Sequence, residues 1–287
     1  MEQDSVRDSF PPIEIGKMEA SIFKKFCHIA YEKSGITLKP GKEALVTARV
    51  AKRQRVLGIS SAKEYLAFLE KDNDDEMIFF LDAISTNYTH FFRENTHFEQ
   101  LTREIGGWLS SGSDRIRIWS AASSTGEEPY SIVITALEAF DNRSVDFRLL
   151  ATDISTNVLS KASSGIYQPL QLEPVLPALR NRYFNRVGRR NSPNEAFEIK
   201  PDVRSYVIFK RLNLSKPPFP MSGPLDAVFC RNVMIYFDQK VRQGLISEIE
   251  RLLKPGGVLM IGHSETLTGI NTGLRIECPS VYRKPGF

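Results

Sequence analysis

Residues 115–131 read RIRIWSAASSTGEEPYS. RIRIWS predicts a short strand, the small residues after it predict a tight turn, and the stretch from about 128 to 140 predicts a helix. This order of strand, turn and helix is typical of the ligand-binding crossover in a doubly wound α/β sheet. Small side chains let the backbone approach a ligand, and the start of the helix offers free N–H groups.

The turn lacks the patterns that bind phosphate groups. It has one glycine, Gly126, where a G-x-G-x-x-G fingerprint needs three, and it contains no G-x-x-x-x-G-K-[ST]. Glu127 and Glu128 follow directly, and their carboxylates would repel a pyrophosphate. They favour a ligand with positive charge, and S-adenosylmethionine meets this requirement through its ammonium and sulfonium groups.

Further strands and helices alternate after this motif. Strands are predicted at 147–152, 206–212, 225–230 and 258–262, and helices at 156–163 and 239–253. Alternation of this kind predicts a mostly parallel sheet with helices on both faces. Residues 165–204 interrupt it as an insertion rich in Arg, Asn and Pro, with short strands near 184–187 and 197–199.

The front third of the chain has helical periodicity only. Helices are predicted from Glu19 to Ser34, at 42–57, at 62–71, and after the acidic cluster at 72–76. Residues 1–15 are polar and are expected to form a loose leader. The predicted organisation is therefore an all-α domain at 16–92 and an α/β domain at 93–287.

Composition excludes several classes of protein. The chain has 287 residues, 41% hydrophobic and 25% charged, as in ordinary globular proteins. No apolar run approaches the ~18 residues of a membrane span, and we see no signal peptide, so we expect a cytoplasmic protein. The three cysteines form no CxxC pair. The four histidines are not at metal-ligand spacing, so we expect no metal site; they are His28, His90, His97 and His263.

Polar residues follow the predicted strands where ligands of such sheets bind. Asp153 ends the second strand and is expected to accept hydrogen bonds from ribose hydroxyls, with a helix N-cap as the alternative. Asn213 and Asn232 follow the next two strands and could hold an adenine ring or an amino-acid group, although Asn also favours turns. On local sequence alone, Tyr236 is as compatible with packing in the core as with a role in the site. Arg93 is likewise compatible with a solvated position in an apolar hinge.

Five segments together resemble one family, the chemotaxis receptor methyltransferases. These are STNYTHFFRE at 85–94, SAASSTGEEPYS at 120–131, ATDIS at 151–155, FCRNVMIYFD at 229–238 and LKPGGVLMIGHSE at 253–265. The resemblance extends over about residues 20–284 and includes the helical front domain. It implies a Rossmann-like methyltransferase domain with a small antiparallel β insertion. It also implies an S-adenosylmethionine-dependent protein-glutamate O-methyltransferase that acts on the cytoplasmic helices of bacterial chemoreceptors in chemotactic adaptation and releases S-adenosylhomocysteine.

The resemblance also implies roles for single residues. Cofactor contacts are expected from Asn87, Thr89, Arg93, Glu128, Asp153, Asn213, Leu214, Asn232 and Val233. Glu128 is preferred over Glu127 for the cofactor's ammonium group. Arg93 and Tyr236 match the family's substrate-positioning residues. Because a glutamate is already ionised at neutral pH, the reaction needs positioning but no general base.

Basic residues are concentrated in two places, although the net charge is only +4. Lys42, Arg49 and Arg53, with Lys52 alongside, form one stripe of the predicted helix at 42–57 and resemble the family's basic surface for Glu-rich receptor helices. Residues 171–211 hold nine basic and four acidic side chains, and an acidic receptor C-terminal peptide could dock on the insertion there. The sequence leaves open whether such a tether is needed.

Two other functions are alternatives to this one. Lys216-Pro-Pro-Phe219 is superficially similar to the motif of nucleic-acid amino methyltransferases, but it begins with Lys and precedes the strand that this motif should follow. A non-catalytic cofactor sensor on the same fold is the second alternative. We therefore expect no nucleic-acid partner, no membrane insertion, and a monomer recruited to membrane receptor arrays.

Overall fold

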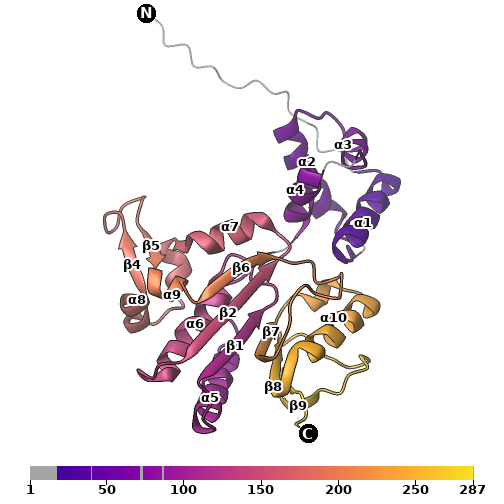
Figure 1. Cartoon of the computed structure of the whole chain (residues 1–287). Coiled ribbons are helices and arrows are strands. Elements are labelled where there is room, and N and C mark those ends of the chain that lie inside the picture. The colour runs from indigo at the N-terminus through magenta and orange to yellow at the C-terminus, as the bar shows by residue number, and fades with distance from the viewer. Residues whose placement is uncertain (1–17, 40, 72–73, 86, 287) are drawn as a thin grey trace, which may run out of the picture. The chain divides into compact units, whose positions relative to one another are not determined.

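The computed structural model describes residues 18–39, 41–71, 74–85 and 87–286 (Figure 1). The chain divides into two compact units, residues 1–32 with 38–84 and residues 33–37 with 85–287. The predicted leader at 1–15 lies outside the described residues. The sequence placed the domain boundary after residue 92, whereas residues 85–92 belong to the second unit.

Helices make up the described part of the first unit, which confirms the predicted all-α domain. They are α1 (Ala20–Ser34), α2 (Glu43–Leu57), α3 (Ala62–Leu69) and α4 (Asp74–Ile84). Phe26, Tyr65 and Phe80 are fully buried at its centre, with ring centroids 5.6 to 6.4 Å apart. Gly58 ends α2 in the left-handed conformation, and the Ser61 side chain caps α3 by accepting a hydrogen bond from the Glu64 N–H at 3.2 Å.

A seven-stranded sheet forms the centre of the second unit, in the order β6-β2-β1-β7-β8-β10-β9. The strands are β1 (Arg115–Ser120), β2 (Asp146–Asp153), β6 (Val207–Arg211), β7 (Leu225–Cys230), β8 (Leu253–Ile261), β9 (Arg275–Cys278) and β10 (Val281–Arg283). The pairs among the first five are parallel, and β10 is antiparallel to β8 and β9. The predicted mostly parallel sheet is confirmed. The chain runs from β1 to β2 and β6 and then to β7 on the other side of β1, so the switch point, where such sheets bind ligands, lies between β1 and β7.

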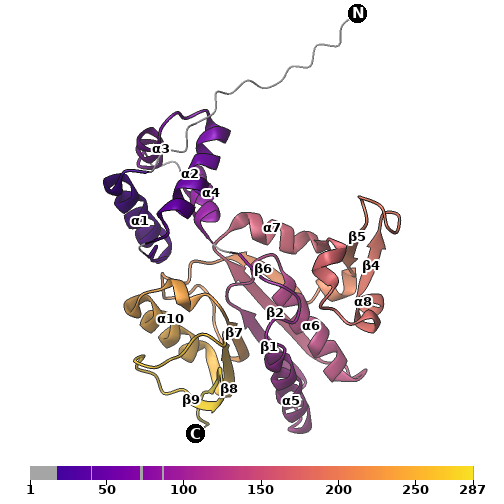
Figure 2. The same cartoon turned by 180° about the vertical axis from the view of Figure 1, so that it is seen from behind.

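Apolar helices pack on the two faces of this sheet (Figures 1 and 2). Helices α5 (Thr96–Ser110) and α6 (Glu127–Phe140) share one core with Phe229 of β7, and α10 (Gln239–Leu252) shares another with Val228, the preceding residue of that strand. Successive residues of a strand point to opposite faces. This explains why all six residues of β7 are buried.

The insertion forms a second, antiparallel sheet in the order β3-β5-β4, which confirms that prediction. Its strands are β3 (Ile166–Tyr167), β4 (Phe184–Val187) and β5 (Ala196–Ile199). Helix α7 (Thr156–Ser164) leads into it, and η1 (Pro169–Leu172), α8 (Pro177–Tyr183) and α9 (Pro201–Arg204) lie within the segment or close it. These last three short helices were not predicted, and each has a proline at its first position, where the missing N–H costs nothing.

Two larger elements were also missed by the sequence reasoning. Helix α5 was not predicted, although Phe98, Leu101, Ile105 and Trp108 are buried along it at helical spacing. The β9–β10 hairpin was not predicted because its outer strand is short and largely exposed. In the described ranges, every helix is too short or too polar to span a bilayer.

Candidate functional site at the carboxyl ends of the strands

Asp153, the last residue of β2, holds the turn between β1 and α6. Its Oδ2 accepts a hydrogen bond from the Ser124 N–H at 2.9 Å, and its Oδ1 accepts one from the Ser155 N–H at 3.0 Å. The N-cap of α7 is Ser155, so the alternative assignment of Asp153 as that cap is wrong.

The turn itself needs its single glycine. Gly126 has φ +98°, and a Cβ there would lie 2.7 Å from the Tyr167 Oη and 2.9 Å from the Ala162 Cβ. Both distances are shorter than real Cβ contacts, so any residue with a side chain would clash there. Glycine lets the backbone of the turn pack directly against α7 and the insertion. The Ser124 hydroxyl in the same turn donates a hydrogen bond to the Asn87 carbonyl at 3.0 Å.

The two glutamates that open α6 face different neighbours. Glu127 accepts hydrogen bonds from the Thr125 hydroxyl at 2.6 Å and from the Gln171 amide of the insertion at 3.0 Å. Glu128 accepts from the Ser120 hydroxyl, at the end of β1, at 2.7 Å, and pairs with the Arg231 guanidinium, just after β7, at 2.9 Å. Burial raises the pKa of Glu128 although Arg231 opposes this shift. Glu128 is thus the carboxylate at the switch point.

Arg231 connects three segments of the site. Its side chain is 1% exposed and pairs with Glu94 at 2.9 Å as well as with Glu128, and its Nη2 also donates to the Arg93 carbonyl. Its guanidinium lies 5.7 Å from the ring centroid of Phe98 in α5. Burial alone would raise the pKa of Glu94, but Arg231 and neighbouring N–H donors lower it below its ordinary value. Arg231 therefore fixes the loop that bears Arg93.

Asn232 and Glu265 close the other side of this network. The Asn232 amide donates to Glu94 at 3.2 Å, and its N–H donates to the Glu265 Oε2 at 2.9 Å. The Gly262 N–H donates to the same Glu265 oxygen at 2.7 Å. A Cβ on Gly262 would lie 2.5 Å from the Asn232 Nδ2, so the segment after β8 is as tightly packed as the turn after β1.

Unfavourable backbone conformations gather at this edge of the sheet. Left-handed φ values occur at Phe92 (54°), Glu94 (56°), Ser124 (47°) and Asn232 (57°), none of which is glycine. Each costs on the order of 1–3 kcal/mol and persists only where the surrounding contacts impose it, which is typical of functional sites.

The segment with Asn87, Thr89 and Arg93 lies beside the turn after β1. One N–H of the Arg93 guanidinium donates to the Tyr88 carbonyl at 2.9 Å, and the guanidinium lies 5.5 Å from the Tyr88 ring centroid. The side chains of Asn87, Thr89 and Arg93 are all half-buried. Tyr236 ends the short helix η2 (Met234–Tyr236) and is half-buried.

The Asn213 side chain is part of a turn in this structure. Its amide donates to the Lys33 carbonyl at 2.7 Å, and its Oδ1 accepts from the Ser215 N–H at 3.0 Å and hydroxyl at 2.8 Å. These bonds form a turn, as Asn residues favour. Leu214 is a core residue, and Val233 packs against the same core.

Half of the basic stripe on α2 has structural partners. Arg53 pairs with Glu76 through two hydrogen bonds of 2.9 and 2.6 Å, and Arg49 donates to the Ile84 carbonyl at 2.7 Å. Lys42 and Lys52 are exposed. Of the four basic residues of this stripe, the two lysines are thus exposed and the two arginines are half-buried with partners in α4.

Two family models match this chain. The CheR methyltransferase, SAM binding domain matches residues 87–281, and the CheR methyltransferase, all-alpha domain matches residues 21–85. The chain belongs to the CheR methyltransferase family. A chemotaxis protein methyltransferase of Borreliella burgdorferi is 39% identical over 280 residues, 95% of this chain and 96% of that protein. One of Salmonella typhimurium is 38% identical over 266 residues, 91% of this chain and 88% of that protein.

The side chains at the switch point fit the S-adenosylmethionine of this CheR family. Glu128 offers a carboxylate for an ammonium group, and Asp153 offers acceptors for hydroxyl groups, with no phosphate-binding turn between them. The prediction of a positively charged cofactor from the sequence is confirmed by the match to a SAM-binding domain.

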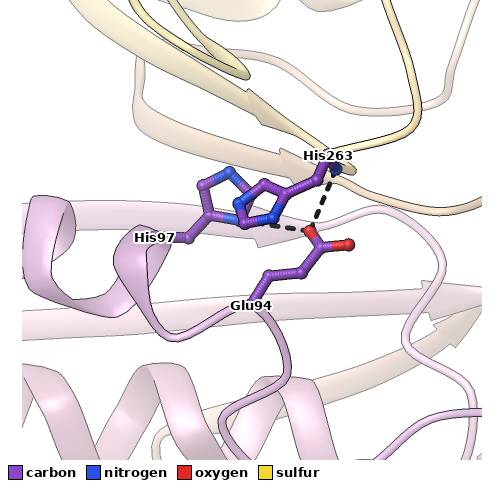
Figure 3. A group of neighbouring side chains, drawn as sticks. All are labelled: Glu94, His97 and His263. Carbon is purple, nitrogen blue, oxygen red and sulfur yellow. Dashed lines mark hydrogen bonds and ion pairs between the residues drawn. The ribbon is translucent and has the colours of Figure 1, made fainter.

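The sequence reasoning missed several residues of the site. Arg231 and Glu265 are charged residues just after the buried strands β7 and β8, the same signal that identified Asp153. Glu94, His97 and His263 lie together in the fold (Figure 3). Spacing along the chain could not reveal this cluster, because His263 follows a strand far from the segment of Glu94 and His97.

Proposed function

We propose that this chain transfers the methyl group of S-adenosylmethionine to glutamate side-chain carboxylates on cytoplasmic helices of chemoreceptors. One observation supports this proposal best. Arg231 joins the Arg93 carbonyl to the Glu128 carboxylate, and Asp153 holds the turn before α6, so the segment that bears the Arg93 guanidinium and the two carboxylates are fixed at the same edge of the sheet. The pair of carboxylates suits the cofactor, and the guanidinium suits a second, anionic reactant.

The proposed chemistry requires positioning alone. S-adenosylmethionine supplies an electrophilic methyl group on its sulfonium, and the receptor glutamate, with a pKa of about 4.3, is ionised at neutral pH. Glu128 binds the ammonium group and Asp153 the ribose hydroxyls. Arg93 has donors beyond the one bonded to the Tyr88 carbonyl, and with Tyr236 it orients the substrate carboxylate.

Other residues complete the cofactor site in this proposal. Asn87, Thr89, Asn232 and Val233 contribute side chains or backbone, whereas Asn213 and Leu214 contribute backbone. The exposed Lys42 and Lys52 contact the acidic receptor helices. The enzyme acts as a cytoplasmic monomer recruited to receptor arrays.

The insertion is proposed to dock an acidic C-terminal receptor peptide. Arg182, Arg186 and Arg204 already pair with Glu138, Glu195 and Glu198. The exposed Arg189 and Arg190 between β4 and β5 are the better candidates for the peptide's carboxylates. Titration with a labelled receptor tail peptide should saturate, and charge reversal of both arginines should weaken binding by tenfold or more. Equal affinity of this variant would contradict the docking site.

Methyl transfer to a purified receptor signalling domain tests the reaction. Arg93→Ala should lower kcat/KM by roughly a hundredfold, a loss of about 2.7 kcal/mol of transition-state stabilisation, because the carboxylate is no longer oriented. Arg103→Ala, an exposed change on α5, is the matched control and should leave kcat/KM unchanged. Full activity of Arg93→Ala would refute the role of Arg93.

The same assay separates the alternatives. Transfer of label to nucleic acid would favour the other methyltransferase class, and cofactor binding without transfer would favour a sensor. The structure gives no support to the first alternative: Lys216–Phe219 precede β7, and the position after β7 is filled by residues 231–237.

A further inference from the structure

Glu94, His97 and His263 form a cluster that the proposed reaction does not use. Among the described residues, one ligand atom from each of these side chains lies within 4.8 Å of the other two (Figure 3). Glu94 belongs to the loop before α5, His97 to the first turn of α5, and His263 to the segment after β8. We propose that this cluster binds a divalent transition-metal ion of the Zn²⁺ class.

His97 is the strongest reason for the proposal. Its side chain is 1% exposed, and neither ring nitrogen has a hydrogen-bond partner among the residues that the structure describes. The Glu94 Oε2 is 3.5 Å from Nδ1, which is too far for a good hydrogen bond. Buried polar groups are rarely left unsatisfied, and a metal ion would bond to one of these nitrogens.

The donor set is suited to such an ion. Two imidazoles and one carboxylate are ligands that Zn²⁺ uses with bond lengths of about 2.0–2.2 Å, and they leave a fourth position open. The rings of His97 and His263 have centroids 4.9 Å apart, so both can turn a nitrogen toward one point. His263 is exposed, and its Nε2 lies 3.1 Å from the Thr96 hydroxyl, a contact that metal binding can replace. Small movements of an exposed side chain therefore close the site.

Arg231 is the cation that opposes metal binding, since it pairs with Glu94. It also pairs with Glu128, so two carboxylates face one guanidinium and the surroundings retain negative charge. The Glu265 carboxylate, two residues after His263, adds to it. The Glu94 Oε2 that faces His97 is also the oxygen paired with Arg231, and Oε1 accepts from the Asn232 amide at 3.2 Å, so a metal ion would share Oε2 with Arg231 or replace Asn232 at Oε1.

Metal titration of the tag-free, chelator-treated full chain tests this site. Co²⁺ should give the visible absorption of a histidine-bound ion, and calorimetry with Zn²⁺ should show one ion bound per chain. His263→Ala should weaken Zn²⁺ binding by roughly tenfold or more, because a ligand is lost. His28→Ala removes an exposed histidine of α1 and should bind like the parent chain.

A thermal scan provides a second readout that is independent of activity. Excess Zn²⁺ should raise the Tm of the parent chain and of His28→Ala, and it should raise the Tm of His263→Ala less. Because His263 is exposed, this variant should fold, and circular dichroism checks that it does. The proposal is overturned if the parent chain binds no Zn²⁺ in a saturable way, or if His263→Ala binds it as tightly as the parent.

Discussion

Arg231 holds the segments of the site in a single arrangement. It is a buried guanidinium with carboxylates on two sides, Glu94 and Glu128. Buried charges are costly to desolvate, and removal of one partner leaves the others uncompensated. Arg231 therefore holds the loop of Arg93 and the start of α6 in fixed positions relative to each other. A reaction that depends on positioning requires such a fixed arrangement.

Replacement of Arg231 tests this constraint. Arg231→Leu should lower the free energy of unfolding of the second unit by about 3–5 kcal/mol, because two buried carboxylates lose their counter-ion. Arg251→Leu breaks the exposed pair with Glu248 and should cost no more than about 1 kcal/mol. Denaturant unfolding followed by tryptophan fluorescence measures both variants. Similar losses in the two variants would contradict the assignment.

The choice between Glu127 and Glu128 can also be tested at single positions. Glu128→Gln should weaken S-adenosylmethionine binding by about tenfold or more, because the charge that faces the ammonium group is lost. Glu127→Gln keeps the same size and faces Gln171, so it should change the Kd less. Calorimetry on both proteins measures the difference, and the reverse order would assign the contact to Glu127.

Helix α2 combines a structural and a binding face. Arg53 pairs with Glu76, which also accepts a hydrogen bond from the buried Tyr65 hydroxyl at 2.7 Å, whereas Lys52, the neighbouring residue, is exposed. In the sequence, Lys52 and Arg53 are two neighbouring basic residues of one predicted helix. The sequence cannot show which of Lys52 and Arg53 is paired, because Glu76 belongs to α4. Only the packing of α2 on α4 brings Glu76 to Arg53.

Paired variants of α2 separate the two roles. Lys52→Glu should raise the KM for receptor several-fold and change stability by less than about 0.5 kcal/mol, as expected for an exposed position. Arg53→Ala should destabilise the first unit by about 3 kcal/mol, because the buried Glu76 carboxylate loses the guanidinium that compensates its charge. Receptor methylation and thermal unfolding are the two measurements. A destabilised Lys52→Glu with normal KM would contradict this division.

Elements with a clear apolar pattern were predictable, and others were not. The strands β1, β2 and β7 and the helices α2, α6 and α10 are defined by local periodicity and stop signals. Helix α5 has an equally good apolar face, but it was not predicted. The helices of the insertion are four to seven residues long, and such short elements depend on their surroundings more than on their own sequence.

Across the chain as a whole, the site is composed of residues from many segments. The sequence identified those that follow strands, such as Asp153 and Asn232. It missed the ones defined by contacts between distant segments, such as Glu94 with Arg231 and His97 with His263. Resemblance to the motifs of a family identifies only residues whose roles are known in that family. A cluster without such a role, like that of His97 with His263, is found only in the folded structure.

The distribution of charge predicts a salt dependence. If exposed basic residues attract an acidic receptor, the KM for receptor should rise several-fold between about 0.05 and about 0.5 M NaCl, where the Debye length shortens from about 14 to about 4 Å. The Kd for S-adenosylmethionine should change less, since Glu128 is largely buried and poorly screened. Methylation independent of salt would contradict an electrostatic receptor surface.

The chemical identity of the product decides whether this chain is a protein-glutamate methyltransferase. Purified enzyme is incubated with methyl-labelled S-adenosylmethionine and a chemoreceptor signalling domain, and the labelled peptides are sequenced by mass spectrometry before and after mild base. We predict label on glutamate side chains of the receptor helices, released by base as expected of a methyl ester. Base-stable label, label on another residue type, or no transfer by the folded, cofactor-binding enzyme would contradict the account.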